Sequence, residues 1–213
     1  MPFLNTYSLR IKIVLLFVVI RLLLIPDQLH AKETKLLILG DSLSAAYGLK
    51  QEQGWVSLLQ DAWQDQDVNV INAAISGETT DGALARLPRL LEQHQPTHIF
   101  VELGGNDGLQ GHPISKIRGN LEEIIQLSQK DKVKVILQQM QIPTNYGTRY
   151  TKMFTASYTQ LAEKHALTLL PFFLENIALD KSLMQRDGIH PTAEAQIIIA
   201  KEMQKTLGGV IFP

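Results

Sequence analysis

The chain has 213 residues, of which 45% are hydrophobic, with 20 basic and 21 acidic side chains and no cysteine. A chain of this length can bury a sizeable core, and a formal net charge of -1 argues against a nucleic-acid binder that relies on a general basic field. The lack of cysteine excludes disulfides, thiolate zinc sites, iron–sulfur clusters and a cysteine nucleophile. We therefore expect a nucleophile in this chain among the oxygen-bearing side chains.

Residues 1–31 have the layout of a secretory signal peptide. Basic residues precede an apolar stretch, and the small residue Ala31 stands at the expected cleavage point. The uninterrupted apolar run from Ile13 to Ile20 is shorter than the ~20 residues that span a bilayer. We expect export to the periplasm or the medium, cleavage after Ala31 and no stable membrane insertion afterwards. A buried N-terminal helix and a retained membrane anchor are the alternatives.

Residues 32–213 read as a strict alternation of apolar strands and amphipathic helices. In chain order we expect a strand at 35–39, a helix at about 52–66, a strand at 68–71, a helix through 84–91, a strand at 99–103, a helix through 117–127, a strand at 133–137, a helix at about 149–165, a short strand at 167–170 and a last helix from Pro191 to Gly208-Gly209. Residues 104–108 are interpreted as the loop that ends the third strand. The pattern predicts one α/β domain with a parallel sheet and helices on both faces.

The loops that follow the strands carry the candidate chemistry. Ser42 follows the first strand, Gly77 the second and Asn106 the third, and the loop before the last helix carries Asp187 and His190. Carboxyl ends of parallel strands share one edge of a sheet, where ligands bind. The alternative for each residue is a structural role, since Ser42, Asp187 and His190 can cap helices and Gly77 can shape a turn.

Together these residues form a set suited to nucleophilic catalysis. A serine hydroxyl is a poor nucleophile until a neighbouring base accepts its proton. An imidazole such as that of His190 can do this near neutral pH, and its second nitrogen then needs an acceptor to fix the tautomer. Asp187 lies three residues away in a turn, near enough to orient the ring.

Four sequence blocks resemble the GDSL, or SGNH, hydrolases in family order. They are GDSLS at 40–44, ISGET at 75–79, GGND at 104–107 and DGIHP at 187–191. The likeness runs over essentially all of residues 32–213. Within the family the chain is most similar to periplasmic bacterial members that act as arylesterases, thioesterases and lysophospholipases.

This resemblance implies a role for each matched residue. Ser42 would be the nucleophile, His190 the base and Asp187 its partner, and the oxyanion hole would combine the N–H groups of Ser42 and Gly77 with the Asn106 amide. It also implies a three-layer α/β/α sandwich like flavodoxin, with five parallel strands in the order 2-1-3-4-5. No metal or cofactor is implied.

The resemblance implies that the substrates are small acyl esters, thioesters and lysophospholipids. We expect the protein to be a monomer. Leu109, Ile142 and Pro143 are candidates for the acyl-chain groove, with core packing as the alternative for each. Phe172 and Phe173 are further candidates on the same terms. A carbohydrate O-deacetylase with the same catalytic residues remains open.

A lipid- or phosphate-binding module on a flavodoxin-like scaffold is the non-enzymatic alternative. Against it, the sequence contains no GxxxxGK[ST] and no GxGxxG phosphate loop. It likewise contains no HExxH motif for a metal hydrolase and no GxSxG elbow of an α/β-hydrolase.

Overall fold

The computed structural model describes residues 33–212, and the expected signal peptide lies outside them. The five strands are β1 (Thr34–Gly40), β2 (Val68–Asn72), β3 (His98–Glu102), β4 (Lys134–Gln138) and β5 (Thr168–Leu170). They form one parallel sheet in the order β2-β1-β3-β4-β5, which confirms the fold class and the strand order implied by the resemblance. The sequence order reverses on either side of β1, so the loops after β1 and β3 meet at the switch point where ligands bind in such sheets.

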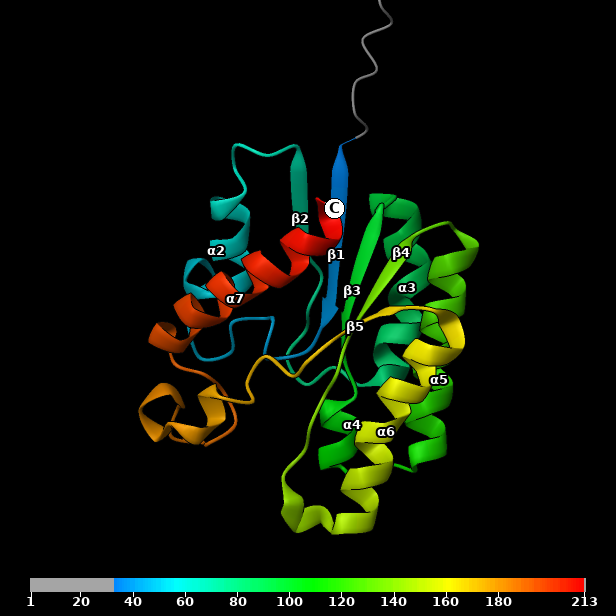
Figure 1. Cartoon of the computed structure of the whole chain (residues 1–213), viewed down its shortest axis with the longest axis vertical. Helices are drawn as coiled ribbons and strands as arrows, with labels where there is room; N and C mark the ends of the chain where they lie inside the picture. Colours follow the sequence, from blue (N-terminus) through cyan, green and yellow to red (C-terminus); the bar gives the residue numbers. More distant parts are fainter. Residues whose placement is uncertain (1–32, 213) are drawn as a thin grey trace, which may run out of the picture. The chain divides into compact units, whose positions relative to one another are not determined.

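Helices cover both faces of this sheet. One face carries α2 (Trp55–Ala62) and α7 (Ala193–Ile211), which pack on each other, and the other carries α3 (Thr80–His94), α5 (Ile114–Lys130) and α6 (Thr148–His165) (Figure 1). The short helices are α4 (Gly105–Leu109) and four 3₁₀ turns, at Gln51–Gln53, Thr144–Tyr146, Ile177–Leu179 and Lys181–Leu183. Within residues 33–212, no helix has the length and apolar character required to cross a bilayer.

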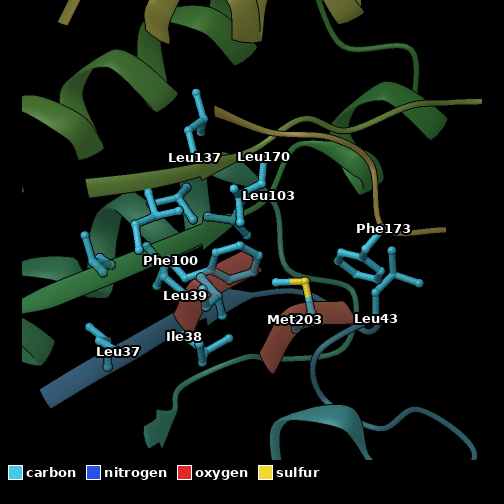
Figure 2. Close-up of a cluster of buried hydrophobic side chains, with 14 of the residues drawn as sticks. Leu37, Ile38, Leu39, Leu43, Phe100, Leu103, Leu137, Leu170, Phe173 and Met203 are labelled. Atoms are coloured by element: carbon cyan, nitrogen blue, oxygen red, sulfur yellow. The ribbon is translucent and has the colours of Figure 1, made fainter. Parts of the chain in front are cut away.

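The core lies on both faces of the two central strands. Leu36 to Leu39 of β1 and Ile99 to Val101 of β3 are fully buried, as expected for strands covered on both faces. Figure 2 shows side chains from four strands gathering with Phe173 and with Met203 of α7. Each fully buried Leu or Phe contributes roughly 1.5–3 kcal/mol relative to exposure. This packing fixes the strand ends from which the site loops emerge.

Two expectations about element boundaries are wrong. Residues 105–108 belong to helix α4 rather than to a loop, because Gly104 adopts φ +99° and turns the chain directly from β3 into a helix. Helix α7 starts after the capping residue Thr192, not at Pro191, and continues through Gly208 and Gly209. The buried side chains of Leu207 and Ile211 offset the cost of two helical glycines, about 1 kcal/mol each.

Candidate active site

Three side chains from two distant parts of the sequence form one continuous line of hydrogen bonds. The Nε2 atom of His190 lies 2.8 Å from the Oγ atom of Ser42, in the turn after β1. The Nδ1 atom of the same ring lies 2.7 Å from Oδ2 of Asp187. The structure therefore brings together the residues that the sequence nominated as nucleophile, base and orienting carboxylate.

Asp187 is held as an ionised acceptor. Its Oδ1 atom accepts the backbone N–H groups of Ile189 at 2.9 Å and of His190 at 3.0 Å. Partial burial raises the pKa of Asp187, but these bonds and the one from the His190 ring outweigh it and lower the pKa to about 2. The carboxylate is thus charged throughout the neutral range, and it fixes the tautomer in which the imidazole nitrogen facing Ser42 accepts a proton.

The loops that carry Ser42 and His190 are tied to each other. The side-chain amide of Gln185 donates to the carbonyl of Tyr47 at 2.9 Å and to that of Pro191 at 3.0 Å, and its backbone N–H donates to the carbonyl of His190 at 2.7 Å. The Tyr47 ring stacks on the imidazole, with centroids 4.1 Å apart and planes inclined by 29°. Tyr47 and Gln185 thereby set the position of the histidine relative to the serine.

Three candidate oxyanion donors surround Ser42. Among residues 33–212, the backbone N–H groups of Ser42 and Gly77 donate to no other group, and Gly77 adopts φ +81° in the loop after β2. The Asn106 side chain, on α4, donates from Nδ2 to Oδ2 of Asp41 at 3.1 Å and to the carbonyl of Glu78 at 2.9 Å. Both amide hydrogens are therefore held by neighbouring loops, so the side chain is fixed in place and one of these bonds must open before the amide can donate to an oxyanion.

Two buried acids lie directly behind the nucleophile. Asp41 is 3% exposed and Glu102, the last residue of β3, is 0% exposed. Burial raises the pKa of Asp41 to about 6 and raises the pKa of Glu102 well above its usual value. Sequence reasoning missed Glu102, although a lone carboxyl at the end of the apolar run 99–103 was a visible signal. It also missed Tyr47 and Gln185, for which the sequence pattern offers no such signal.

The candidate acyl-groove residues are not equivalent in the structure. Leu109 is half-buried at the end of α4, and Pro143 is exposed beside the turn Thr144–Tyr146. Ile142 is buried beneath α4, where it would contact any side-chain carbon at Gly108. Phe172 and Phe173 line a separate cavity of about 200 Å³ against α7. The roles of Leu109, Ile142 and Pro143 stay predictions.

An open groove of about 720 Å³ begins just beyond α4. It lies between the loop at Gly111–Pro113 and the start of α6, and His112, Tyr146, Tyr150 and Met153 are among its lining residues. The hydroxyl of Tyr150 donates to the carbonyl of His112 at 2.6 Å and connects the two walls. Among residues 33–212, no group of three or more His, Asp or Glu side chains has an arrangement that could hold a metal ion.

Comparisons with known proteins agree with this arrangement. Residues 38–196 match the model of the GDSL-like Lipase/Acylhydrolase family. The chain is 48% identical to an arylesterase of Vibrio mimicus over 81% of this chain and 88% of that protein, and 47% identical to Thioesterase 1/protease 1/lysophospholipase L1 of Escherichia coli (strain K12) over 83% and 84%.

A solved structure supports the same relationship. The psychrotrophic esterase EstA from Pseudoalteromonas sp., in a crystal structure inhibited by monoethylphosphonate, superposes with a TM-score of 0.82 at 48% identity, covering 84% of this chain and all of that one. Sequence, family model and fold thus agree over nearly all the described residues, and the chain belongs to the GDSL-like lipase/acylhydrolase family.

Proposed function

We propose that this protein hydrolyses acyl esters and thioesters through an acyl-enzyme on Ser42. The observation that carries the proposal is the unbroken line of hydrogen bonds from Asp187 through His190 to the Ser42 hydroxyl. A serine in such an arrangement loses its proton to the imidazole as it attacks a carbonyl carbon. No other set of three side chains within residues 33–212 joins a hydroxyl, an imidazole and a carboxylate in this order.

The reaction proceeds in two acyl transfers. Ser42 Oγ forms a bond to the carbonyl carbon while His190 Nε2 takes the hydroxyl proton, and the negative charge on the carbonyl oxygen is stabilised by the N–H groups of Ser42, Gly77 and Asn106. His190 then gives the proton to the departing alcohol or thiol, which leaves the acyl group on Ser42. Water, deprotonated by His190, attacks the acyl carbon; the bond from that carbon to Oγ breaks, His190 returns the proton to Oγ, and the carboxylic acid leaves.

The relatives support the substrate class. Their names include arylesterase, thioesterase and lysophospholipase, which share an acyl carbonyl joined to an oxygen or sulfur leaving group. The groove next to α4 is open to solvent and lined by side chains such as Tyr146 and Met153, which supports a role in holding an acyl chain. We propose that Leu109 and Pro143 contact this acyl chain. We further propose that residues 1–31 direct export and that the mature enzyme acts as a monomer.

Trapping with a phosphonate ester tests the nucleophile directly. An alkyl p-nitrophenyl phosphonate should add one phosphonyl group to Ser42, located by peptide mass spectrometry, and should abolish hydrolysis of p-nitrophenyl esters. Ser42→Ala should be inactive and unlabelled with an unchanged circular dichroism spectrum, whereas Ser57→Ala, on α2, should remain active. Label on another residue, or an active and folded Ser42→Ala protein, would refute the proposal.

A substrate series separates the esterase from a carbohydrate O-deacetylase. We expect hydrolysis of octanoyl and palmitoyl esters and of acyl-CoA thioesters by the purified mature protein. Hydrolysis of acetylated sugars without activity on longer acyl groups would favour the deacetylase instead.

A further inference from the structure

Asp41 and Glu102 are two buried carboxylic acids that lie next to each other, since the backbone N–H of Asp41 donates to Oε2 of Glu102 at 3.2 Å. Neither makes a salt bridge to a lysine or arginine among residues 33–212. Two adjacent carboxylates without a paired cation cannot both be charged in a low-dielectric interior, because the desolvation cost and mutual repulsion are too large. The pair must therefore hold one proton, and the hydrogen bonds around each oxygen indicate where it lies.

The two acids have different sets of partners. Oδ1 of Asp41 accepts the N–H of Leu43 at 3.0 Å, and Oδ2 accepts the amide of Asn106 at 3.1 Å. Oε2 of Glu102 accepts both the N–H of Asp41 at 3.2 Å and the hydroxyl of Ser44 at 2.8 Å. Oε1 of Glu102 is buried and accepts from no donor in the described part of the chain.

We propose that Glu102 carries the proton on Oε1 and donates it in a hydrogen bond to Asp41, so that Asp41 stays anionic and anchors the amide of Asn106. In this arrangement Oε2 is a carbonyl oxygen with two donors, and Oε1 is a hydroxyl that is no longer without a partner. Each Asp41 oxygen accepts a protein N–H, which is the environment that stabilises a carboxylate. The proton thus lies on the acid whose free oxygen needs a partner.

The surroundings favour this distribution. Burial raises the pKa of Asp41, whereas the N–H of Leu43 and nearby His190 lower it; for Glu102, burial and the Asp41 charge both raise the pKa. Tyr158, another buried titratable group here, donates its hydroxyl to the carbonyl of Leu103 at 2.8 Å, and burial raises its pKa, so it remains neutral. None of these groups supplies a fixed cation that would let both acids ionise.

Two glycines, Gly40 and Gly105, provide the space that the carboxyl groups of Glu102 and Asp41 occupy. A Cβ atom at Gly40 would lie 2.8 Å from Oε2 of Glu102, and one at Gly105 would lie 3.2 Å from Oδ2 of Asp41. A side chain at Gly40 would displace the Glu102 carboxyl, and one at Gly105 would crowd the oxygen that accepts from Asn106. Two glycines of the sequence blocks around Ser42 and Asn106 thus accommodate the acids behind the nucleophile.

Asp41 is a positioning residue in this scheme, because it acts through Asn106 rather than on substrate. A charged acceptor holds an N–H group more firmly than a neutral one. The second amide hydrogen of Asn106 points to the carbonyl of Glu78, in the loop that carries Gly77. We infer that this second bond yields to the oxyanion during the reaction while the bond to Asp41 persists. This part of the inference rests on the proposed function, whereas the position of the proton does not.

The position of the proton is tested by the pH dependence of folding. A carboxyl that is protonated when folded and ionised when unfolded lowers the folding equilibrium constant about tenfold for each pH unit. We expect denaturant titrations to show that the folding equilibrium constant of the wild type falls between about pH 6.5 and 8.5. The constant of Glu102→Gln should fall less over this range, because the glutamine keeps a neutral donor in place. Exposed Glu123→Gln, on α5, is the matched control and should keep the wild-type slope. Equal slopes for the wild type and Glu102→Gln would overturn the proposal.

Infrared spectroscopy gives an independent measurement on the unmodified chain. A protonated carboxyl group has a C=O stretch distinct from that of a carboxylate. We expect this band at neutral pH in the wild type, shifted when glutamate carries a ¹³C label, unshifted when only aspartate is labelled, and missing in Glu102→Gln. A band that follows aspartate labelling would place the proton on an aspartate instead of Glu102 and contradict the proposal.

The anchoring role of Asp41 is tested by Asp41→Asn. The neutral amide weakens the acceptor for Asn106, so we expect kcat to fall at least roughly tenfold with little change in KM, since an oxyanion donor acts mainly in the transition state. Glu102→Gln should retain more activity than Asp41→Asn, and exposed Asp61→Asn is the control. An unchanged kcat in folded Asp41→Asn would remove the anchoring role. An active Ser42→Ala protein in the same assay would instead refute the proposed function and leave the protonation result standing.

Discussion

The phenol ring of Tyr47 lies over the imidazole of His190, with the ring centroids 4.1 Å apart. Ala46 and Gly48 on either side adopt φ +57° and +73°, and this left-handed backbone turns Tyr47 toward the histidine. With 48% of its surface exposed, Tyr47 is not held by burial in the core. Its position is set by the local backbone and by Gln185, which suggests that the stacking serves the histidine rather than the fold.

Replacing Tyr47 should therefore affect turnover more than stability. An aromatic face stabilises a nearby cation by about 0.5–1 kcal/mol at an exposed site, so Tyr47→Ala should lower kcat roughly two- to fivefold through the imidazolium that forms in the transition state. Tyr47→Phe keeps the ring and should retain most activity. Steady-state kinetics of the three proteins check this, and equal kcat values for Tyr47→Ala and the wild type would disprove it.

Asn106→Ala should reduce kcat by about 10²–10³, the usual effect of removing one oxyanion donor. The substitution also removes the N–H that Oδ2 of the buried Asp41 carboxylate accepts, so the thermal transition should fall as well while the domain stays folded. Single-turnover kinetics with a p-nitrophenyl ester would show slower acylation. A variant that binds substrate poorly but turns it over at the normal rate would point instead to a role in binding.

Asp187→Asn should make stability less dependent on pH under acid conditions. The folded-state pKa of Asp187 is about 2, below its ordinary value of 3.8, so its contribution is present above pH 3.8 and is lost as the pH falls through about 2. The side chain is 37% exposed and screened by solvent, so the difference should be about 1 kcal/mol or less at pH 6 and vanish near pH 2. Urea titrations at both pH values measure it. If the difference in stability between the wild type and Asp187→Asn persisted at pH 2, the charged Asp187 carboxylate would not be its source.

Glycines 104 and 119 form a contrasting pair for substitution by alanine. Gly104 adopts φ +99°, and a Cβ there would lie 2.4 Å from the buried hydroxyl of Tyr158, whereas Gly119 in α5 has open space around it. Gly104→Ala should destabilise the domain by more than about 2 kcal/mol, through both strain and overpacking. Gly119→Ala should stabilise it by up to about 1 kcal/mol through helix propensity. Thermal unfolding of both variants measures these changes. If both substitutions shifted the melting temperature in the same direction, this account would be contradicted.

Strand and helix periodicity predicted the fold well because the strands are buried on both faces. The apolar runs at 35–39 and 99–103 lie within one or two residues of β1 and β3, where burial and pattern coincide. Helix α4 escaped prediction because Gly-Gly-Asn-Asp-Gly has turn composition, and only the left-handed Gly104 and the buried Asp107 make it helical. Asp107 accepts both the N–H and the hydroxyl of Thr80, a contact that local sequence cannot reveal.

The candidate site was predictable in its residue types but not in its support. Ser42, His190 and Asp187 could be nominated because hydroxyl, imidazole and carboxylate occur in loops at one sheet edge. The contacts that orient them depend on side chains distant in sequence, such as the amide of Gln185 reaching Tyr47 and the Glu102 carboxyl beneath Asp41. Burial and long-range hydrogen bonds determine these positions, and neither follows from periodicity.

The central place of β1 in the sheet has a consequence for how the domain folds. β1 pairs with β2 on one side and with β3 on the other, so the strand nearest the amino terminus gains both neighbours only after residues 98–102 have been made. Ser42 then meets His190, 148 positions later, once the last loop has docked. Long-range parallel pairing of this kind slows folding. Recovery of esterase activity should therefore lag behind recovery of secondary structure during refolding and report the final step of assembly.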